Sequence, residues 1–124
     1  DTEVLAEIDK AGGAGKPRQA AATVCWGGDE ATCRELVHER WPNSGLPGEL
    51  AQELPTPGHM AQAVSLVTED VAVGSTPCGD DPERFVESFR TYEDAGFDQL
   101  FLQQISPDFA GFLEFFVQEI RPRF

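Results

Sequence analysis

The last third of the chain has the clearest pattern of apolar and polar positions. Apolar residues recur at helical spacing after Asp81-Pro82, and Gly96 follows the last of them. Aspartate before proline is typical of a helix start, and a left-handed glycine commonly follows a helix end. The apolar run 97–104 then predicts a strand, and a second amphipathic helix is expected over 108–120. Helix, strand and helix with short connections indicate an α/β fold with parallel strands.

The first part of the chain has the same order of strand and helix. Residues 18–26 are small and β-branched without clean alternation, which is typical of a strand buried on both faces, although periodicity alone leaves a helix open. A glycine pair and Asp29 then precede a predicted helix over 30–41, which Pro42 ends. A short helix over 3–11 is expected before this unit.

Residues 42–80 between the two units are rich in proline and glycine. Within them the pattern predicts one helical turn over 49–54 and a short helix capped by Thr56. Residues 69–80 are expected to be irregular, with a short extended piece at 71–74. We therefore expect one partial domain over 1–124 with four parts: a leading helix (1–13), a strand–helix unit (18–41), an insertion (42–80) and a closing helix–strand–helix segment (81–124).

Two predicted strands are too few for this composition. A two-stranded parallel sheet leaves both of its edges unpaired, and it cannot cover helices that carry much of a set of nine phenylalanines and two tryptophans. The remaining strands must come from a missing segment or from another copy of the chain. The start at Asp1, with no initiator methionine, favours a missing segment, since we expect that residue 1 is not the natural beginning.

The charge of the chain argues against several classes of partner. It has 22 acidic and 9 basic residues, a net charge of −13, and no basic stripe. A nucleic-acid backbone or an anionic membrane surface would be repelled by this field. No apolar run approaches the ~18–20 residues of a spanning helix, and the acidic start does not resemble a secretion signal.

The three cysteines are Cys25, Cys33 and Cys78, an odd number without a CxxC pair. Their spacing therefore predicts no zinc or redox site, and we expect Cys25 and Cys33 to be reduced core thiols in a cytoplasmic protein. No spacing of histidine and acidic residues predicts a metal site either.

Several blocks in one order resemble the C-terminal part of the luciferase-like oxidoreductases, in the branch that uses the deazaflavin coenzyme F420. The resemblance extends along essentially the whole chain. The blocks are Lys16-Pro17-Arg18, Thr23–Trp26, His38–Asn43, Leu50–Pro57, Pro77–Arg84, Ala95–Asp98 and Arg121–Phe124.

This resemblance implies the C-terminal portion of a TIM-type (β/α)8 barrel, with two parallel strands, helices and an insertion. Residues 18–26 would be strand seven and 97–104 strand eight, with 42–76 lying over the mouth of the barrel. In the family, strands one to six hold most of the coenzyme's ring and phosphate-bearing tail and the principal catalytic side chains. The resemblance therefore implies hydride transfer between F420 and a small organic substrate in an intact parent. It assigns no catalytic or cofactor-binding residue to this chain, and the isolated segment is expected to be inactive.

Four residues are candidates for a substrate pocket. Trp26, Gln103 and Gln104 are expected near the carboxyl ends of their strands, which form the active face of a barrel. His59 lies in the insertion and is the better candidate of the two histidines, because His38 is expected on the solvated side of its helix. The alternative is that Trp26 caps the core and the glutamines cap backbone amides.

Three further patterns have ordinary explanations. The run Gly12–Lys16 lacks the hydroxyl residue and the preceding strand of a phosphate loop, so it predicts a helix stop and a turn. The acidic pairs 69–70 and 80–81 are common in so acidic a chain, and Asp81 is accounted for by helix capping. Residues 42–83 contain no lysine or arginine, whereas the sugar-phosphate dehydrogenases of the resembled family place cations in and after the insertion, so the resemblance argues against a sugar-phosphate substrate.

Two other functions stay open. The chain could be a short, non-catalytic interaction module that completes its sheet by self-association. It could also be an enzyme that is active as a half-barrel dimer, but the sequence has no glycine-rich phosphate cradle to support a cofactor site.

Overall fold

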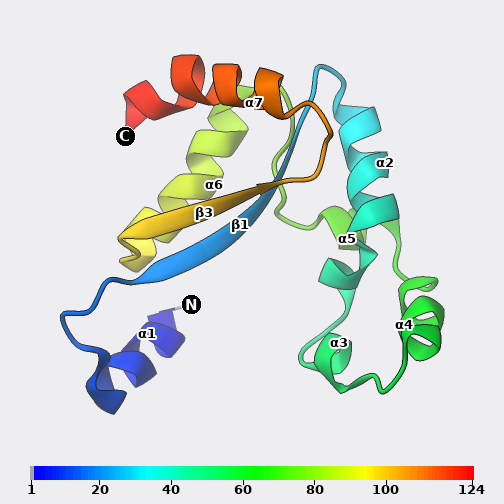
Figure 1. Ribbon diagram of the computed structural model, residues 1–124, viewed down its shortest axis with the longest axis horizontal. Helices are drawn as coiled ribbons and strands as arrows, with labels where there is room; N and C mark the ends of the chain where they lie inside the picture. The colour runs from blue at the N-terminus through cyan, green and yellow to red at the C-terminus, as the bar shows by residue number, and fades with distance from the viewer. Residues whose placement is uncertain (1) are drawn as a thin grey trace.

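The computed structural model describes residues 2–124, which form a mixed α/β fold around a small parallel sheet (Figure 1). The sheet has the order β2-β1-β3, with β1 at Gln19–Trp26, β2 at Cys78–Gly79 and β3 at Gln99–Gln104. Both neighbours are parallel to β1, and its register with β3 joins Gln19 to Gln99 and Val24 to Gln104. The described residues therefore form an open sheet with two edges.

Short and medium helices connect and cover the strands. Their bounds are α1 Thr2–Ile8, α2 Glu30–Arg40, α3 Leu50–Glu53, α4 Pro57–Val64, α5 Glu69–Val73, α6 Pro82–Ala95 and α7 Phe109–Phe115. Single turns of other helix types lie at Asp9–Gly13, Pro42–Gly45, Phe116–Ile120 and Arg121–Arg123.

One face of the sheet is covered by α6 and by the last helix. The last helix comprises α7 and the turn Phe116–Ile120 that continues it. Side chains alternate along a strand, so Val24 and Leu102 point to this face, where they meet Phe85, Phe112 and Ile120 in one hydrophobic cluster. Phe85 and Ile120 are fully buried. Helix α6 and the last helix are therefore held to the sheet mainly by aromatic and aliphatic packing.

A second, smaller cluster lies on the opposite face of β1, at its carboxyl end. Cys25 and Cys78 are register partners on adjacent strands, and Cys33 and Val37 of α2 pack on them. All three cysteines are buried and free, as the sequence predicted for Cys25 and Cys33. Helix α2 thus covers only the carboxyl end of this face.

The rest of that face is open. It carries Gln19, Ala21 and Thr23 of β1, and their register partners Gln99, Phe101 and Gln103 of β3. Phe101 is 60% exposed, and its two glutamine neighbours on this face are exposed as well. No other element of the described chain packs over the middle of this face as α6 packs over the other.

The ends of α6 form as the local sequence predicts. The Asp81 carboxylate accepts a hydrogen bond from the amide of Glu83 at 3.0 Å, and Pro82 occupies the first turn. Gly96 ends the helix in the left-handed conformation at φ 91°, which a residue with a Cβ adopts only with strain. The hydroxyl of Thr56 likewise caps α4.

Three details differ from the sequence predictions. The short extended segment is Cys78–Gly79, because it pairs with the end of β1, whereas residues 71–74 belong mainly to α5. The strand expected over 97–104 begins at Gln99, after the turn that Gly96 makes. The leading helix spans Thr2–Ile8 and continues as a wider turn to Gly13; Asp1 lies outside the described residues.

Phe85→Ala should lower the free energy of unfolding by about 3–5 kcal/mol, because the side chain is fully buried and its removal leaves a cavity. Urea denaturation followed by circular dichroism measures the change. Leu66→Ala is the control: Leu66 is 84% exposed, and its loss should change stability by no more than about 0.5 kcal/mol. Similar losses in the two variants would contradict this account of the core.

The native thiols should be unreactive. Burial raises the pKa of Cys25 to about 12 and the pKa of Cys78 to about 11, with neighbouring Cys33 adding to both shifts. A thiol reagent such as DTNB, used near the ordinary thiol pKa of about 8.5, should label the native protein very slowly. All three cysteines should react promptly in urea. Rapid labelling of the folded protein would show that this cluster opens to solvent.

Candidate functional site

Ligands of parallel α/β folds bind at the carboxyl ends of the strands. On the open face of this sheet, the polar side chains nearest that end are Thr23 and Gln103, which are register partners. Beyond them Cys25 and Ile105 are covered by α2. A hydroxyl and an amide side by side can donate and accept hydrogen bonds to a polar ligand. Neither group is a proton-transfer acid or base at neutral pH, so this pair is suited to binding.

Gln104 has a different role, because its side chain points to the covered face and is 8% exposed. Its Oε1 accepts a hydrogen bond from the Trp26 amide at 2.9 Å, and its Nε2 donates to the Trp26 carbonyl at 3.1 Å. Along the strands, these two side-chain hydrogen bonds come directly after the backbone hydrogen bond from the Ile105 amide to the Val24 carbonyl, which is 2.9 Å long. Gln104 therefore continues the pairing of β1 with β3 beyond the last backbone bond.

The Trp26 ring packs against the last helix. Its centroid lies 5.7 Å from that of Phe115, and a Cβ added at Gly111 would stand 2.6 Å from the indole. Glycine at 111 is therefore required for the helix to approach this closely. The indole Nε1 is buried and has no hydrogen-bond partner among the described residues.

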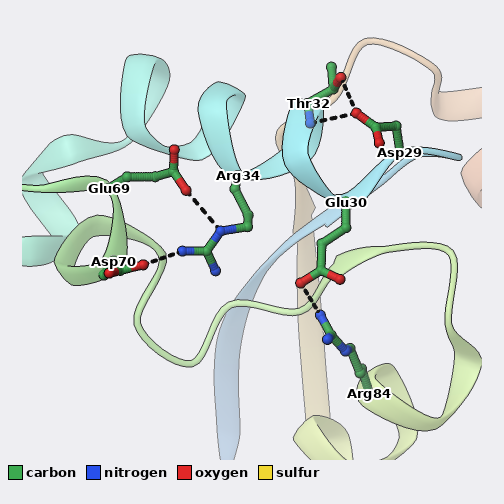
Figure 2. A network of polar contacts seen from close by, with 7 residues as sticks. All are labelled: Asp29, Glu30, Thr32, Arg34, Glu69, Asp70 and Arg84. Atoms are coloured by element: carbon green, nitrogen blue, oxygen red, sulfur yellow. Dashed lines mark hydrogen bonds and ion pairs between the residues drawn. The ribbon is translucent and has the colours of Figure 1, made fainter.

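A network of ion pairs ties α2 to its neighbours at the same end of the sheet (Figure 2). The Arg34 guanidinium donates to Glu69 at 2.8 Å and to Asp70 at 2.5 Å, which joins α2 to α5. Arg84 of α6 donates to Glu30 at 2.5 Å. These hydrogen bonds raise the pKa of both arginines. Since each guanidinium already faces a carboxylate, the network does not offer a free cation to an anionic ligand.

Asp29 caps the amino end of α2 beside this network. Its carboxylate accepts hydrogen bonds from the Thr32 hydroxyl at 2.5 Å and the Thr32 amide at 2.9 Å (Figure 2). The Thr32 hydroxyl, followed by the amide, lowers the pKa of Asp29. The cap therefore stabilises the fold above the ordinary aspartate pKa of about 3.9, and this stability is lost as pH falls through the lower folded-state value.

The two histidines lie apart from the strand ends. His59 is on the exposed helix α4, which Figure 1 shows beyond α5 and α2 from the sheet, and its Nδ1 lies 3.0 Å from the Thr56 hydroxyl. His38 corrects the prediction of a solvated residue: it is half-buried, and its Nε2 lies 2.8 Å from the Val67 carbonyl. This contact links α2 to the insertion, which the polar pattern of the helix did not reveal.

The structure therefore separates the four predicted pocket residues. Trp26 and Gln104 lie together on the covered face, Gln103 is on the open face, and His59 is in the insertion. Thr23 was missed by the sequence analysis. Its signal was the one polar residue within the small and apolar run 20–26, and only the register with β3 shows what it faces.

Two hollows of the described chain lie beside strands of the sheet. One of about 390 Å³ lies at the amino end of β3, away from the carboxyl ends where ligands bind. The other, of about 380 Å³, lies beside β2 and contains the paired Arg34 and Arg84. The hollow that His59 lines includes none of the other predicted pocket residues.

Residues 2–124 contain no group of three or more histidine, cysteine or acidic side chains arranged to hold a metal ion. Within the same residues, no helix has both the length and the apolar character needed to cross a membrane.

Comparison with solved structures finds this fold in an F420-dependent secondary alcohol dehydrogenase, determined in complex with an F420–acetone adduct. The TM-score is 0.72 over 94% of this chain, at 18% sequence identity. The chain spans 37% of the length of that protein. No protein-family model matches, and no curated protein matches in sequence. At this identity the similarity establishes the fold, a mixed α/β arrangement with a small parallel sheet.

The residues present do not by themselves fit coenzyme F420. A flat ring could contact Phe101 and form hydrogen bonds with Thr23 and Gln103. A phosphate-bearing tail, by contrast, needs cations or a cradle of free amides. The arginines of the network in Figure 2 are engaged by carboxylates, and the net charge of −13 opposes an anion. The network in Figure 2 therefore does not supply a site for the tail.

Gln104→Ala should lower the free energy of unfolding by about 1–3 kcal/mol, because it leaves polar backbone atoms of Trp26 without partners. The matched control is Gln103→Ala, at the adjacent but exposed glutamine, which should change stability by no more than about 0.5 kcal/mol. Chemical denaturation of the two variants makes the comparison. Equal stability would exclude a structural role for the Gln104 amide.

Proposed function

We propose that this chain is the C-terminal part of a luciferase-like, F420-dependent oxidoreductase, in which hydride passes between the deazaflavin and a small organic substrate. The observation that carries the proposal is the fold similarity to an F420-dependent alcohol dehydrogenase, which covers 94% of this chain and 37% of that protein. The proposal is supported independently by the sequence blocks that resemble this family and occur in the same order along the chain.

The form of the sheet supports a barrel origin. A parallel sheet is normally covered on both faces, but here the middle of one face is open and Phe101 is exposed on it. In a (β/α)8 barrel this face would be the interior, with β1 as strand seven, β3 as strand eight and residues 42–80 as the insertion between them. Further strands would then cover the open face.

In such a barrel, Thr23 and Gln103 would contact the bound molecules from the carboxyl ends of their strands. None of the six side chains on the open face is ionisable at neutral pH, so this part of the protein would bind and orient ligands. Proton transfer and attachment of the coenzyme's tail would belong to the remaining strands. The isolated segment would then be inactive. Its free, buried thiols are compatible with a reducing compartment, and we place the parent in the cytoplasm.

A second candidate function is a non-catalytic interaction module that completes its sheet by self-association. The observation that favours it is β3, an edge strand that has no partner on its outer side among residues 2–124 and contains no charged residue. This candidate needs no cofactor.

A titration of F420 by its fluorescence separates the two functions. The isolated chain should show no saturable change, whereas the longer polypeptide encoded by the reading frame that contains it should bind. In that polypeptide Gln103→Ala should weaken binding about tenfold, corresponding to the loss of about one hydrogen bond. Gln118→Ala, at an exposed glutamine of the last helix, should have no effect.

Two outcomes would contradict the proposal. Tight F420 binding by the isolated chain would show that the tail site lies in these residues. A reading frame without further strands, or one whose product does not bind F420, would favour the interaction module.

A further inference from the structure

One arginine at the carboxyl ends of the strands lies outside the network of Figure 2. Arg40 is in the last turn of α2, and its Nη1 donates to the Ile105 carbonyl at 3.4 Å. It follows Cys33 and Val37 at helical spacing, so it belongs to the side of α2 that packs on the sheet. Figure 1 shows α2 beside the end toward which β1 and β3 run. Arg40 therefore places a positive charge where β3 ends, on the side of the open face.

The Arg40 guanidinium is free to bind a ligand. It is exposed and forms no ion pair within residues 2–124. A guanidinium has five N–H donors, and the contact with Ile105, which is long for a hydrogen bond, uses one of them. A cation in the last turn of a helix is favourable whichever way it points. The helix end therefore explains a basic residue here, but not its position over the strand end.

The other cations of the described chain do not serve this place. Arg34 and Arg84 face carboxylates in the network. Lys16 precedes β1 and Arg121 lines the hollow at the amino end of β3, so both belong to the opposite end of the sheet. Arg90 lies over an aromatic ring at the C-terminus. Three more cations are paired with acidic residues: Lys10, Arg18 and Arg123. Within the described residues, a ligand at the carboxyl ends of β1 and β3 thus meets one free cation.

The hydrogen-bonding groups of the open face lie a short distance from this charge. Gln103 precedes Ile105 by two residues, about 7 Å along the strand, and faces the same side of the sheet. Thr23 is the register partner of Gln103. The arrangement therefore has one positive charge at one end and two uncharged polar groups at the other, separated by about the length of a small organic molecule.

We propose that the substrate is a small acid whose single carboxylate binds Arg40 and whose uncharged polar group, such as a hydroxyl, binds Gln103 and Thr23. This inference rests on the proposed function and names the substrate class of that site. A carboxylate matches the planar fork of an arginine. A phosphate monoester carries nearly two charges at neutral pH and is less well matched to one cation. The net charge of −13 opposes every anion, so the affinity depends on this guanidinium.

Calorimetric titration of the longer polypeptide with matched acids and amides tests this inference. The probes are glycolate, lactate and 3-hydroxybutyrate at neutral pH, each beside its own amide, which has nearly the same shape but no charge. They are titrated with F420 bound and without it. In at least one pair the acid should bind about tenfold or more tightly than the amide, as expected for hydrogen bonds to a charged group.

Arg40→Gln should remove this preference for the acid. Arg40→Lys should keep part of it, because lysine retains the charge without the planar fork. The matched control is Arg121→Gln, at another arginine without an ion-pair partner in the described chain but at the amino end of β3, which should leave the preference unchanged. Each variant should keep the circular dichroism spectrum and the F420 affinity of the parent protein, since the substituted side chains are exposed and lie outside the proposed coenzyme contacts.

Several outcomes would overturn the inference and leave the proposed function intact. These are equal binding of acid and amide in every pair by a protein that binds F420, a preference that Arg40→Gln does not remove, and tighter binding of inorganic phosphate than of all three acids. A loss of F420 affinity in Arg40→Gln would also overturn it, because the guanidinium would then hold the coenzyme's anionic tail.

The proposed function fails in a different way. A polypeptide that does not bind F420 would contradict the oxidoreductase proposal. Because the acids are also titrated without the coenzyme, a preference that Arg40→Gln removes would still support the acid site at the strand ends.

Discussion

β1 is the strand on which both hydrophobic clusters are built. Val24 faces the cluster formed with α6 and the last helix, and the next residue, Cys25, faces the cluster formed with α2. Because parallel strands are joined through long crossovers, this arrangement brings segments distant in sequence onto one strand. The register of β1 with β3 therefore decides which side chains are buried, and a shift of one residue would exchange the covered and open faces.

The polar contacts have a different function from the clusters. Ion pairs from Arg34 and Arg84 hold α2 to α5 and α6, and His38 connects α2 to the end of the insertion. These groups are at least partly exposed, so each contributes little stability by itself. Together they determine where the insertion lies relative to the strand ends. The packing in the two clusters supplies the larger part of the stability, and the ion pairs supply orientation.

Local features were predictable from the sequence because their causes are local. Asp81, Gly96 and Thr56 determine helix ends through hydrogen bonds and backbone angles within a few residues. β2 was missed because two residues contain no periodicity, and its formation depends on pairing with β1. The extended segment predicted at 71–74 proved mainly helical, since Val73 is buried against α2 as part of α5.

The same difference between local and long-range causes applies to the candidate site. Three of its predicted residues do lie at the carboxyl ends of strands, but the strand pattern could not show which face each side chain takes. Gln103 and Gln104 are adjacent and chemically identical, yet one is exposed and the other is buried against Trp26. Only the register distinguishes them, and it is determined by contacts between residues about eighty positions apart.

The Gln104 side chain resembles a peptide group in what it does for Trp26. It presents one carbonyl and one N–H to the backbone of β1, as a further residue of β3 would. The main chain is thus released from the sheet after Ile105 and can turn into the segment that leads to α7. The turn beyond this point can therefore change in length without loosening the sheet, which leaves the connection at this strand end free to diverge between proteins that share the same strands.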